Sequence, residues 1–274
     1  MKRVLCHPDG EKSCGACCGM YNHREWGEEE VRERLRRRTR AYHQEARIDD
    51  LESLRDFRAK WEDPPAVKLL TELPSCPFLG FLGDDGERVG CLVHPLQNDG
   101  IDGRDCGVYD RFICEDYLCA AHDVLRREEV DFVLAAVKDS YLYGLAITNP
   151  RFVRTLMEEV ARRTGAQPGA KDLLAPAVVE AGARCFEWLR AWRFRGEDGI
   201  FGQSEVTGPL QTARRRELAP GVVAEKTGVD LLLLCLGTRC AGEVEVDQAR
   251  RLVVRGLEEL SEAVDQAVER RLQR

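Results

Sequence analysis

The sequence lacks any apolar run long enough to cross a membrane. The longest one, Leu231-Leu232-Leu233-Leu234-Cys235-Leu236, is about a third of the roughly 18 residues that a membrane span requires. The basic N-terminal segment, Met1 to Pro8, is not followed by the apolar stretch of a secretory signal. We therefore expect a cytoplasmic protein that does not have a membrane as its partner.

The sequence also lacks an excess of positive charge and any motif for binding a nucleotide. Its net charge is −7, which disfavours nucleic acid as the main partner. No glycine-rich loop follows an expected strand with phosphate-binding or dinucleotide spacing. No catalytic triad or carboxylate pair can be singled out either. The sequence therefore predicts neither catalytic residues nor an organic cofactor, and it leaves open whether the protein is an enzyme.

Cysteine is abundant, and it is concentrated in one half of the chain. Of the 12 cysteines, nine lie in residues 1–123 together with all five histidines. Cytosolic thiols are kept reduced, so clustered cysteines are expected to bind metal and not to form disulfides. Residues 1–123 also carry the whole net charge, because 124–274 hold equal numbers of acidic and basic residues. The sequence predicts two domains: a metal-binding domain over 1–123 and a helical domain over 124–274.

The sharpest motif is Cys14-Gly15-Ala16-Cys17-Cys18-Gly19. A Cys-x-x-Cys turn lets two thiolates reach one metal centre, and the adjacent glycines let backbone amides turn toward the sulfurs. This segment has almost no aliphatic residues against which a core thiol could pack. The vicinal pair Cys17-Cys18 is unusual, because neighbouring side chains of an extended segment diverge. The second thiol must therefore serve another edge of a cluster, a second metal, or neither.

A second group of cysteines lies between residues 76 and 122. It begins with Cys76-Pro77, a pair common at cluster ligands because proline stiffens the turn. Two Cys-x-x-His pairs follow at Cys91/His94 and Cys119/His122, although each histidine alone is a better candidate for a surface or packing residue than for a ligand. The predicted metal ligands are Cys6, Cys14, Cys17, Cys18, Cys76, Cys91, Cys106, Cys114 and Cys119. The remaining thiols, Cys185, Cys235 and Cys240, lie in apolar or helical surroundings and are predicted to be core residues.

At these motifs the sequence resembles a family of bacterial proteins. Cys-Gly-x-Cys-Cys, then Cys-Pro-Phe-Leu, an Asp-Gly turn and Cys-x-Val-His are similar to the cysteine-cluster (YkgJ-type) family, which carries a putative zinc- or iron-chelating domain. The flagellin lysine methylases have a similar arrangement. The resemblance covers roughly residues 6–119. It implies a metal site and carries over the ligands Cys14, Cys17, Cys18, Cys76 and Cys91.

The sequence departs from the family pattern at two places, and these affect the number of ligands. The family often has a cysteine four residues before the first motif, where this chain has Gly10. We expect Cys6 to replace that cysteine as a ligand. The usual Arg-Pro-x-x-Cys closing is replaced by a longer loop over 97–105 before Cys106, which matches a later family cysteine.

Two metal centres fit this set of residues. Iron–sulfur clusters take four cysteines, and the number of thiols, the vicinal pair and Cys-Pro favour a 4Fe–4S cluster. Zinc also accepts histidine, which the two Cys-x-x-His pairs favour. A cluster predicts a redox or protein-modifying role, whereas structural zinc predicts a protein-interaction module. In both cases the partner would be a protein or a protein substrate.

The apolar pattern predicts a mainly α fold, with a loop-rich N-terminal half that has little β structure, packed against a C-terminal helical bundle. A highly charged amphipathic helix or helix pair is expected over 28–62, ended by Asp63-Pro64-Pro65. The best strand candidate is 88–94, in a hairpin that turns at Asp84-Asp85-Gly86. Residues 195–225 are expected to form a long connection. The other predicted helices cover 127–146, 172–194 and 247–273, with a further one that begins at Pro150 after an N-cap at Asn149.

Overall fold

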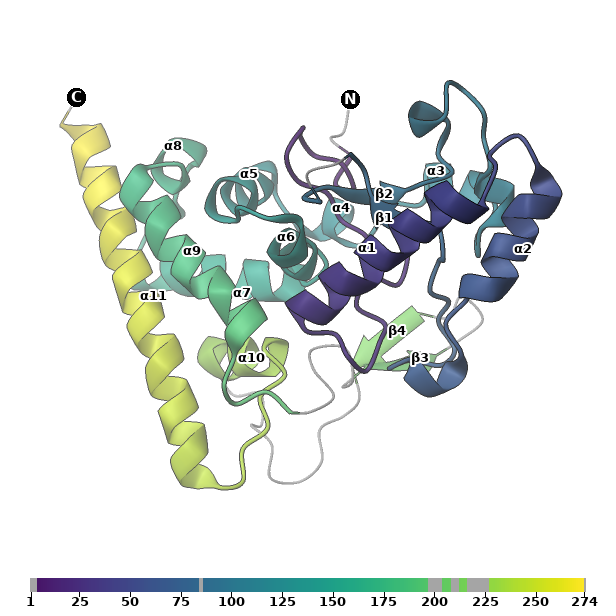
Figure 1. The fold of residues 1–274 in the computed structure, drawn as a ribbon. Coiled ribbons are helices and arrows are strands. Elements are labelled where there is room, and N and C mark those ends of the chain that lie inside the picture. The colour runs from purple at the N-terminus through teal and green to yellow at the C-terminus, as the bar shows by residue number, and fades with distance from the viewer. Residues whose placement is uncertain (1–3, 84–85, 197–203, 208–211, 216–226, 274) are drawn as a thin grey trace. The chain divides into compact units, whose positions relative to one another are not determined.

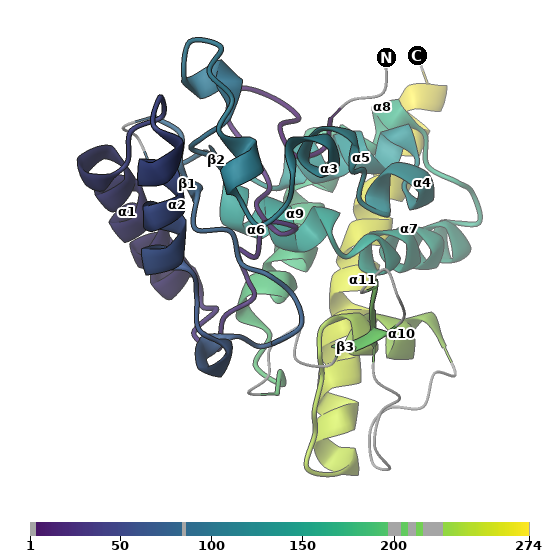
Figure 2. The same cartoon turned by 90° about the vertical axis from the view of Figure 1, so that its right-hand side faces the viewer.

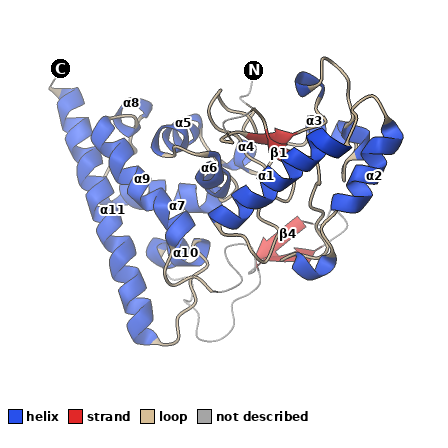
Figure 3. Cartoon of the chain, viewed as in Figure 1, coloured by secondary structure: helices blue, strands red, loops and turns tan. Residues whose placement is uncertain are grey.

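A computed structural model describes residues 4–83, 86–196, 204–207, 212–215 and 227–273. Helices predominate among these residues, and the strands form only two short hairpins (Figure 3). The predicted mainly α fold class is confirmed. The chain divides into two compact units, and the predicted boundary after residue 123 stays a prediction. The first unit is Met1–Cys119, Asp139–Gly144 and Ser204–Arg215, and the second is Ala120–Lys138, Leu145–Gln203 and Arg216–Arg274.

The charged segment of the first unit forms two helices, α1 (Glu28–Glu45) and α2 (Leu51–Trp61), which lie side by side (Figure 2). Three glutamates occupy the first turn of α1, where negative charge complements the helix dipole. The carboxylate of Asp50 caps α2 by accepting hydrogen bonds from the amides of Glu52 and Ser53 at 3.0 and 3.1 Å. The helix-pair form of the prediction for 28–62 is therefore confirmed.

A short antiparallel hairpin follows these helices. Strand β1 (Leu79–Phe81) pairs with β2 (Val89–Cys91), and Leu79 lies opposite Cys91. The predicted strand is present but shorter than 88–94, because the chain turns at Leu92 into a short 3-10 helix. Two residues of the predicted turn, 84 and 85, lie outside the described residues. The 3-10 helices of this unit are Pro65–Val67, Pro95–Gln97 and Arg104–Cys106, and its α3 is Arg111–Asp116.

The segment Asp139–Gly144 belongs to the first unit through buried tyrosines. The hydroxyl of Tyr143 donates to the carbonyl oxygen of Leu5 at 2.8 Å. The hydroxyl of Tyr21 donates to the carbonyl oxygen of Tyr141 at 2.7 Å, and the two rings meet edge to face. These bonds tie the N-terminal loop to a segment more than a hundred residues away.

An aromatic core lies beneath the hairpin of the first unit. The rings of Phe57 and Phe78 stack with centroids 5.4 Å apart, and Tyr42 meets both rings edge to face. The buried residues around them include Leu54 and Cys106. This core packs against α1 and α2, so the helices support the hairpin and the cysteines beside it.

The second unit is helical throughout its described part, apart from an isolated bridge between Arg195 and Thr238. Its longest helices, α9 and α11, run alongside each other (Figure 1) and bury an apolar stripe that includes Leu257 and Val264. Helix α6 begins in the first unit and ends in the second. The helices are α4 (Ala121–Val124), α5 (Arg127–Ala136), α6 (Ser140–Ile147), α7 (Pro150–Thr164), α8 (Ala170–Leu173), α9 (Pro176–Ala191), α10 (Gly228–Cys235) and α11 (Glu243–Leu272).

The helix start at Pro150 is confirmed, with the Asn149 side chain accepting a hydrogen bond from the Phe152 amide. The single helix predicted over 127–146 is wrong. It is broken after Ala136, because Val137 is extended and Asp139 caps a new helix by accepting from the amide of Leu142 at 2.8 Å. The apolar spacing continues across the break, which is why periodicity alone missed it.

The expected connection 195–225 contains a second hairpin in its described part, β3 (Ser204–Thr207) paired with β4 (Thr212–Arg215). The hairpin is an element that the weak periodicity of this connection did not predict, and residues 197–203, 208–211 and 216–226 lie outside the described residues. The helices predicted over 172–194 and 247–273 are present with shifted bounds. Within the described ranges, no helix combines the length and the apolar character needed to span a membrane.

Candidate metal centre

The N-terminal loop brings two of the predicted ligands together. The amide of Cys14 donates to the carbonyl oxygen of Cys6 at 2.9 Å. Leu5 is buried beside Cys6, and its carbonyl is held by Tyr143. The loop is thus fixed by backbone bonds and by one buried aliphatic side chain, so that both thiols stand on an ordered support.

The turn that carries Cys17 and Cys18 makes a close approach to Cys76. The amide of Cys76 donates to the carbonyl oxygen of Cys18 at 2.9 Å. Gly19 has a φ of 87°, and a Cβ there would lie 2.6 Å from the Cα of Ser75. Only glycine permits both this conformation and this proximity. The motif glycine therefore allows the two cysteine segments to meet.

The first hairpin brings Cys91 to the same place. Cys76 precedes β1, and its carbonyl oxygen accepts from the amide of Leu79, the residue paired with Cys91. Cys91 ends β2, which places its thiol beside that of Cys76. Hairpin pairing thus aligns two cysteines that are fifteen positions apart.

Two further predicted ligands lie in and just after helix α3. Asp110 caps this helix by accepting from the amide of Ile113 at 2.9 Å. Cys114 lies within the helix and Cys119 shortly after it. Between them, the side chain of Tyr117 is hydrogen-bonded to the thiol of Cys17. The hydrogen bond of Tyr117 thus links the segment after α3 to the Cys17-Cys18 turn.

Four thiols form one neighbouring group, which we name the Cys6 set: Cys6, Cys14, Cys17 and Cys119. Burial, followed by the charge of Cys119, raises the pKa of Cys6. Burial raises the pKa of Cys14 well above its ordinary value, and the other three members raise it further. Although Cys17 has exposed surface, loss of hydration, followed by Cys6 and Cys119, raises its pKa to about 12. Each member is thus within electrostatic reach of others in the set.

Four other thiols form a second group, the Cys18 set: Cys18, Cys76, Cys91 and Cys114. Burial raises the pKa of Cys18 well above its ordinary value, with Cys76 and Cys91 as the next causes. Burial, followed by Cys76, raises the pKa of Cys91 to about 12. Burial and Cys76 also raise the pKa of Cys114. The sequence analysis assigned these thiols and the Cys6 set to the same nine ligands without dividing them.

Backbone amides point at the sulfurs of both sets in a repeated pattern. The amide two residues after the cysteine hydrogen-bonds the sulfur at Cys14, Cys76 and Cys91. The amide of Val108 gives Cys76 a second such bond. Amide bonds of this kind stabilise thiolate charge and tune the potential of a bound cluster. The donor set therefore fits a metal centre that holds thiolates.

Cys106, also a predicted ligand, is a member of the buried core of the first unit. It is buried in the aromatic core with Tyr42 and Phe57. Burial raises its pKa, and the charged neighbours that act on it are Arg55, Asp105 and Arg58. Cys76 and Cys91 pack against the same core, whereas no thiol is among the groups that shift the pKa of Cys106.

Two of the histidines in the first unit use a ring nitrogen for local structure. His94 Nδ1 accepts a hydrogen bond from the amide of Leu96 at the start of a 3-10 helix. His23 Nδ1 accepts from the amide of Glu25. Burial, followed by Arg88, lowers the pKa of His7. These roles are typical of structural histidines.

As the side chains stand, no three His, Cys, Asp or Glu residues in the described ranges form a group that could hold a metal ion. Thiolates that share one zinc ion at about 2.3 Å would lie about 4 Å from each other. The ligands of a four-iron cluster instead bind different iron atoms.

Two tyrosines beside the thiols were missed by the sequence analysis. The hydroxyl of Tyr109 donates to the carbonyl oxygen of Cys17 at 3.4 Å. Burial, followed by Cys18, Cys17 and Cys76, raises its pKa to about 12. Its position one residue before the Asp110 cap gives no sequence signal, whereas Tyr117 could have been noticed between two cysteines.

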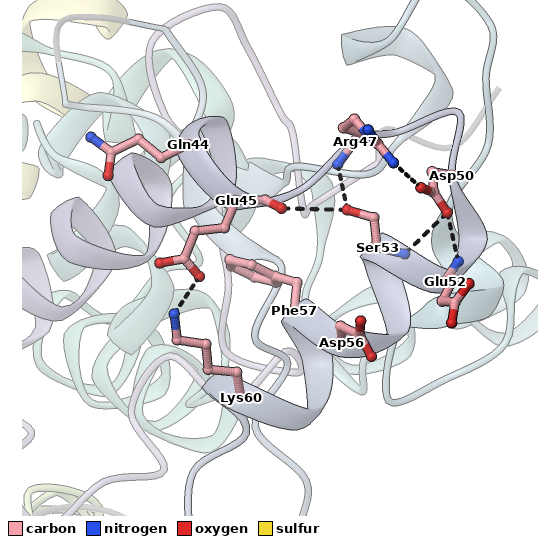
Figure 4. Close-up of a pocket in the computed structure, with 9 residues that line it drawn as sticks. All are labelled: Gln44, Glu45, Arg47, Asp50, Glu52, Ser53, Asp56, Phe57 and Lys60. Atoms are coloured by element: carbon pink, nitrogen blue, oxygen red, sulfur yellow. Dashed lines mark hydrogen bonds and ion pairs between the residues drawn. The ribbon is translucent and has the colours of Figure 1, made fainter.

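A polar hollow between the end of α1 and α2 is a separate feature of the first unit (Figure 4). Its charged side chains pair with one another: Lys60 with Glu45 at 2.9 Å, and Arg47 with Asp50. None of the nine residues that line it is a cysteine. The hollow therefore adds no ligand to the metal centre.

The three cysteines predicted as core residues belong to the second unit. Cys185 and Cys235 are buried, and the Cys185 thiol donates weakly to the carbonyl oxygen of Gly256 at 3.7 Å. Cys240 is only partly buried. The core prediction fits the first two residues better than the third.

Comparison with known proteins identifies no relative: no family model matches the chain, and no curated protein or solved structure matches it either. The resemblance to the cysteine-cluster family stays a prediction that rests on the motifs themselves.

Proposed function

We propose that this protein binds iron–sulfur through the cysteines of its first unit and uses it in electron transfer or in modification of a protein. The observation that carries the proposal is the gathering of eight thiols from six places in the sequence, several of them with amide donors to sulfur. A 4Fe–4S cluster takes four cysteine ligands. The cluster would supply one-electron chemistry, and the chain would hold it and set its potential.

Electrostatics favours a positively charged occupant. Each thiol lies near others that raise its pKa, so several thiolates together would repel one another without a cation. Metal ions bound to thiolates remove this repulsion, and they supply folding free energy to a segment that has few aliphatic residues. The thiols would serve as ligands once deprotonated.

A protein partner or protein substrate has a contact surface beside these thiols. The apolar side chains of Phe112 and Tyr117 are 65% and 56% exposed, and Leu118 is 48% exposed. Phe112 lies in α3 with Cys114, and Tyr117 and Leu118 lie between this helix and Cys119. Exposed apolar side chains next to one another favour contact with another protein, and here that contact would lie close to the redox centre.

Anaerobic purification followed by visible absorption tests the proposal. We expect a brown protein whose absorption near 400 nm decreases when dithionite is added. A colourless protein with stoichiometric zinc would reject it. That result would support the second candidate, a structural-zinc module for protein interaction, which the Cys-x-x-His pairs favour in the sequence.

A further inference from the structure

Helix α3 is exposed on every side. None of its six residues is buried, although a helix this short is unstable in water unless other contacts hold it. Polar contacts hold it in place: the cap by Asp110, the ion pair of Glu115 with Arg104 at 3.5 Å, and that of Arg111 with Asp105 at 3.6 Å. The apolar side chains of the helix are therefore left facing solvent.

Exposed apolar side chains are concentrated around this helix. Of the twelve large apolar side chains that are exposed in the described residues, six lie within residues 96–118, which are less than a tenth of the chain. Four of these lie in α3 or directly after it, and we name them the α3 surface: Phe112, Ile113, Tyr117 and Leu118. Exposed apolar side chains that gather in this way mark a surface for contact with another protein.

The same stretch carries more than half of the net negative charge of the chain. Residues 99–118 hold six acidic and two basic residues, a balance of −4 within the total of −7. Of the basic side chains, that of Arg104 is only 8% exposed, whereas the acidic side chains of Glu115 and Asp105 are 67% and 54% exposed. Asp116 is exposed as well. The apolar side chains of α3 are thus accompanied by exposed carboxylates.

We propose that the α3 surface is the docking site for a basic protein, which covers Phe112 with apolar side chains and meets Glu115 and Asp116 with lysine or arginine. This inference rests on the proposed function and names the partner of the metal centre. Opposite charges steer association and fix the orientation of the partner. Nucleic acid, an anionic membrane and a second copy of this chain are all negatively charged, and the carboxylates would repel them.

The docking site is connected to the predicted metal centre. The side chain of Tyr117, a member of the α3 surface, is hydrogen-bonded to the thiol of Cys17. A predicted ligand, Cys114, lies within α3 itself. A partner that covers this surface would therefore lie close to the centre with which it exchanges electrons or by which it is modified.

Cross-linking of the full chain to cytochrome c, a small basic electron-carrier protein, locates the docking site without any variant. A carbodiimide joins a carboxylate to a lysine that contacts it, and mass spectrometry identifies the joined residues. At low ionic strength we expect cross-links at Glu115 and Asp116. In about 1 M salt, where the Debye length falls to about 3 Å, their yield should decrease at least about tenfold. Cross-links spread over exposed carboxylates of the second unit, such as Glu180 and Glu262, would overturn the proposal, and so would the absence of cross-links.

Binding to immobilised cytochrome c separates the charged contribution from the apolar one. Asp116→Lys should weaken binding at least about tenfold, whereas Glu262→Lys, the same change at an exposed position of α11, should leave it unchanged. Phe112→Ala should weaken binding at least about fivefold, and Leu272→Ala, at a side chain that is 76% exposed, is its control. Equal effects of the α3 variants and their controls would overturn the docking site.

Metal analysis of the same samples keeps this inference apart from the proposed function. Protein that contains zinc and no iron, and that still binds cytochrome c through α3, would contradict the proposed function alone. Iron-containing protein whose binding is insensitive to Asp116→Lys and Phe112→Ala would contradict the docking site alone.

Discussion

The two units of this protein achieve order by different means. In the second, α7, α9 and α11 bury aliphatic and aromatic side chains such as Leu156, Phe186 and Leu257 almost completely. In the first, the aromatic core lies under α1 and α2, while the loops that carry the cysteines depend on backbone bonds and single buried residues. Under the proposed function, packing orders the second unit, whereas metal ligation offsets the conformational entropy of the cysteine loops in the first unit.

Buried charges sharpen the contrast. In the second unit Glu129 is fully buried, and it is paired with Arg126 at 2.9 Å and Arg154 at 3.3 Å. Asp230 is likewise paired with Arg250 at 2.9 Å. The buried thiols of the first unit instead lie beside other thiols. A buried anion needs a partner charge. Both units supply one for their carboxylates, as Arg38 does for Asp63 at 2.6 Å in the first unit, whereas thiolates of the first unit would obtain theirs from metal.

Metal removal should have the largest effect on protease resistance, and it should affect the first unit but not the second. A structural metal contributes on the order of 10 kcal/mol of folding free energy, so chelation should increase protease cleavage near residues 10–25 and 95–110 by at least about tenfold. The helices of the second unit should resist cleavage as before. Limited proteolysis with mass spectrometry measures both. Equal loss of resistance in the two units would mean that they do not differ in this way.

Cys76→Ser and Cys106→Ser should differ in their effect on metal content, although both cysteines are predicted ligands. Cys76 receives two amide bonds and lies beside other thiols, so its loss should remove about half of the bound metal or more. Cys106 lies in the aromatic core, so its substitution should cost about 1 kcal/mol of stability and leave the metal content unchanged. Metal analysis and thermal melting measure these effects. Loss of metal in the Cys106 variant would make that residue a ligand.

Leu257→Ala tests whether apolar packing stabilises the second unit independently of metal binding. Leu257 is fully buried on α11, and removing a buried leucine side chain costs about 2–5 kcal/mol. The metal content should stay as in wild type. Leu272→Ala on the same helix is the control, because Leu272 is 76% exposed and should change stability by less than about 0.5 kcal/mol. Denaturant unfolding measures the difference, and a loss of metal in the Leu257 variant would show that the units are coupled.

Asp50→Ala should have the smallest effect. It removes the side chain that caps α2 through Glu52 and Ser53, and loss of such a cap costs about 1 kcal/mol. Asp56→Ala, an exposed change within the same helix, should be close to neutral. Thermal melting compares the two variants. Equal stability would mean that the cap contributes nothing measurable.

The sequence predicted what depends on local pattern. It indicated the helix pair over 28–62 and the cap at Asn149, because both follow from residue type and spacing. It missed the break at Val137 because apolar periodicity continues across it, although Asp139 three positions before Leu142 is a capping signal. It could not show how the N-terminal turn meets the later cysteines, since that depends on the long-range bond between Cys18 and Cys76.

The most direct test of the account is X-ray absorption at the iron and zinc edges of one anaerobically purified sample. The account predicts iron with sulfur in its first shell and further iron in the next shell, together with no more than trace zinc. Stoichiometric zinc bound by sulfur, with no iron signal, would contradict the cluster and leave only the structural-zinc alternative. Absence of both metals from protein that nevertheless keeps its first unit folded would contradict the claim that ligation orders the cysteine loops.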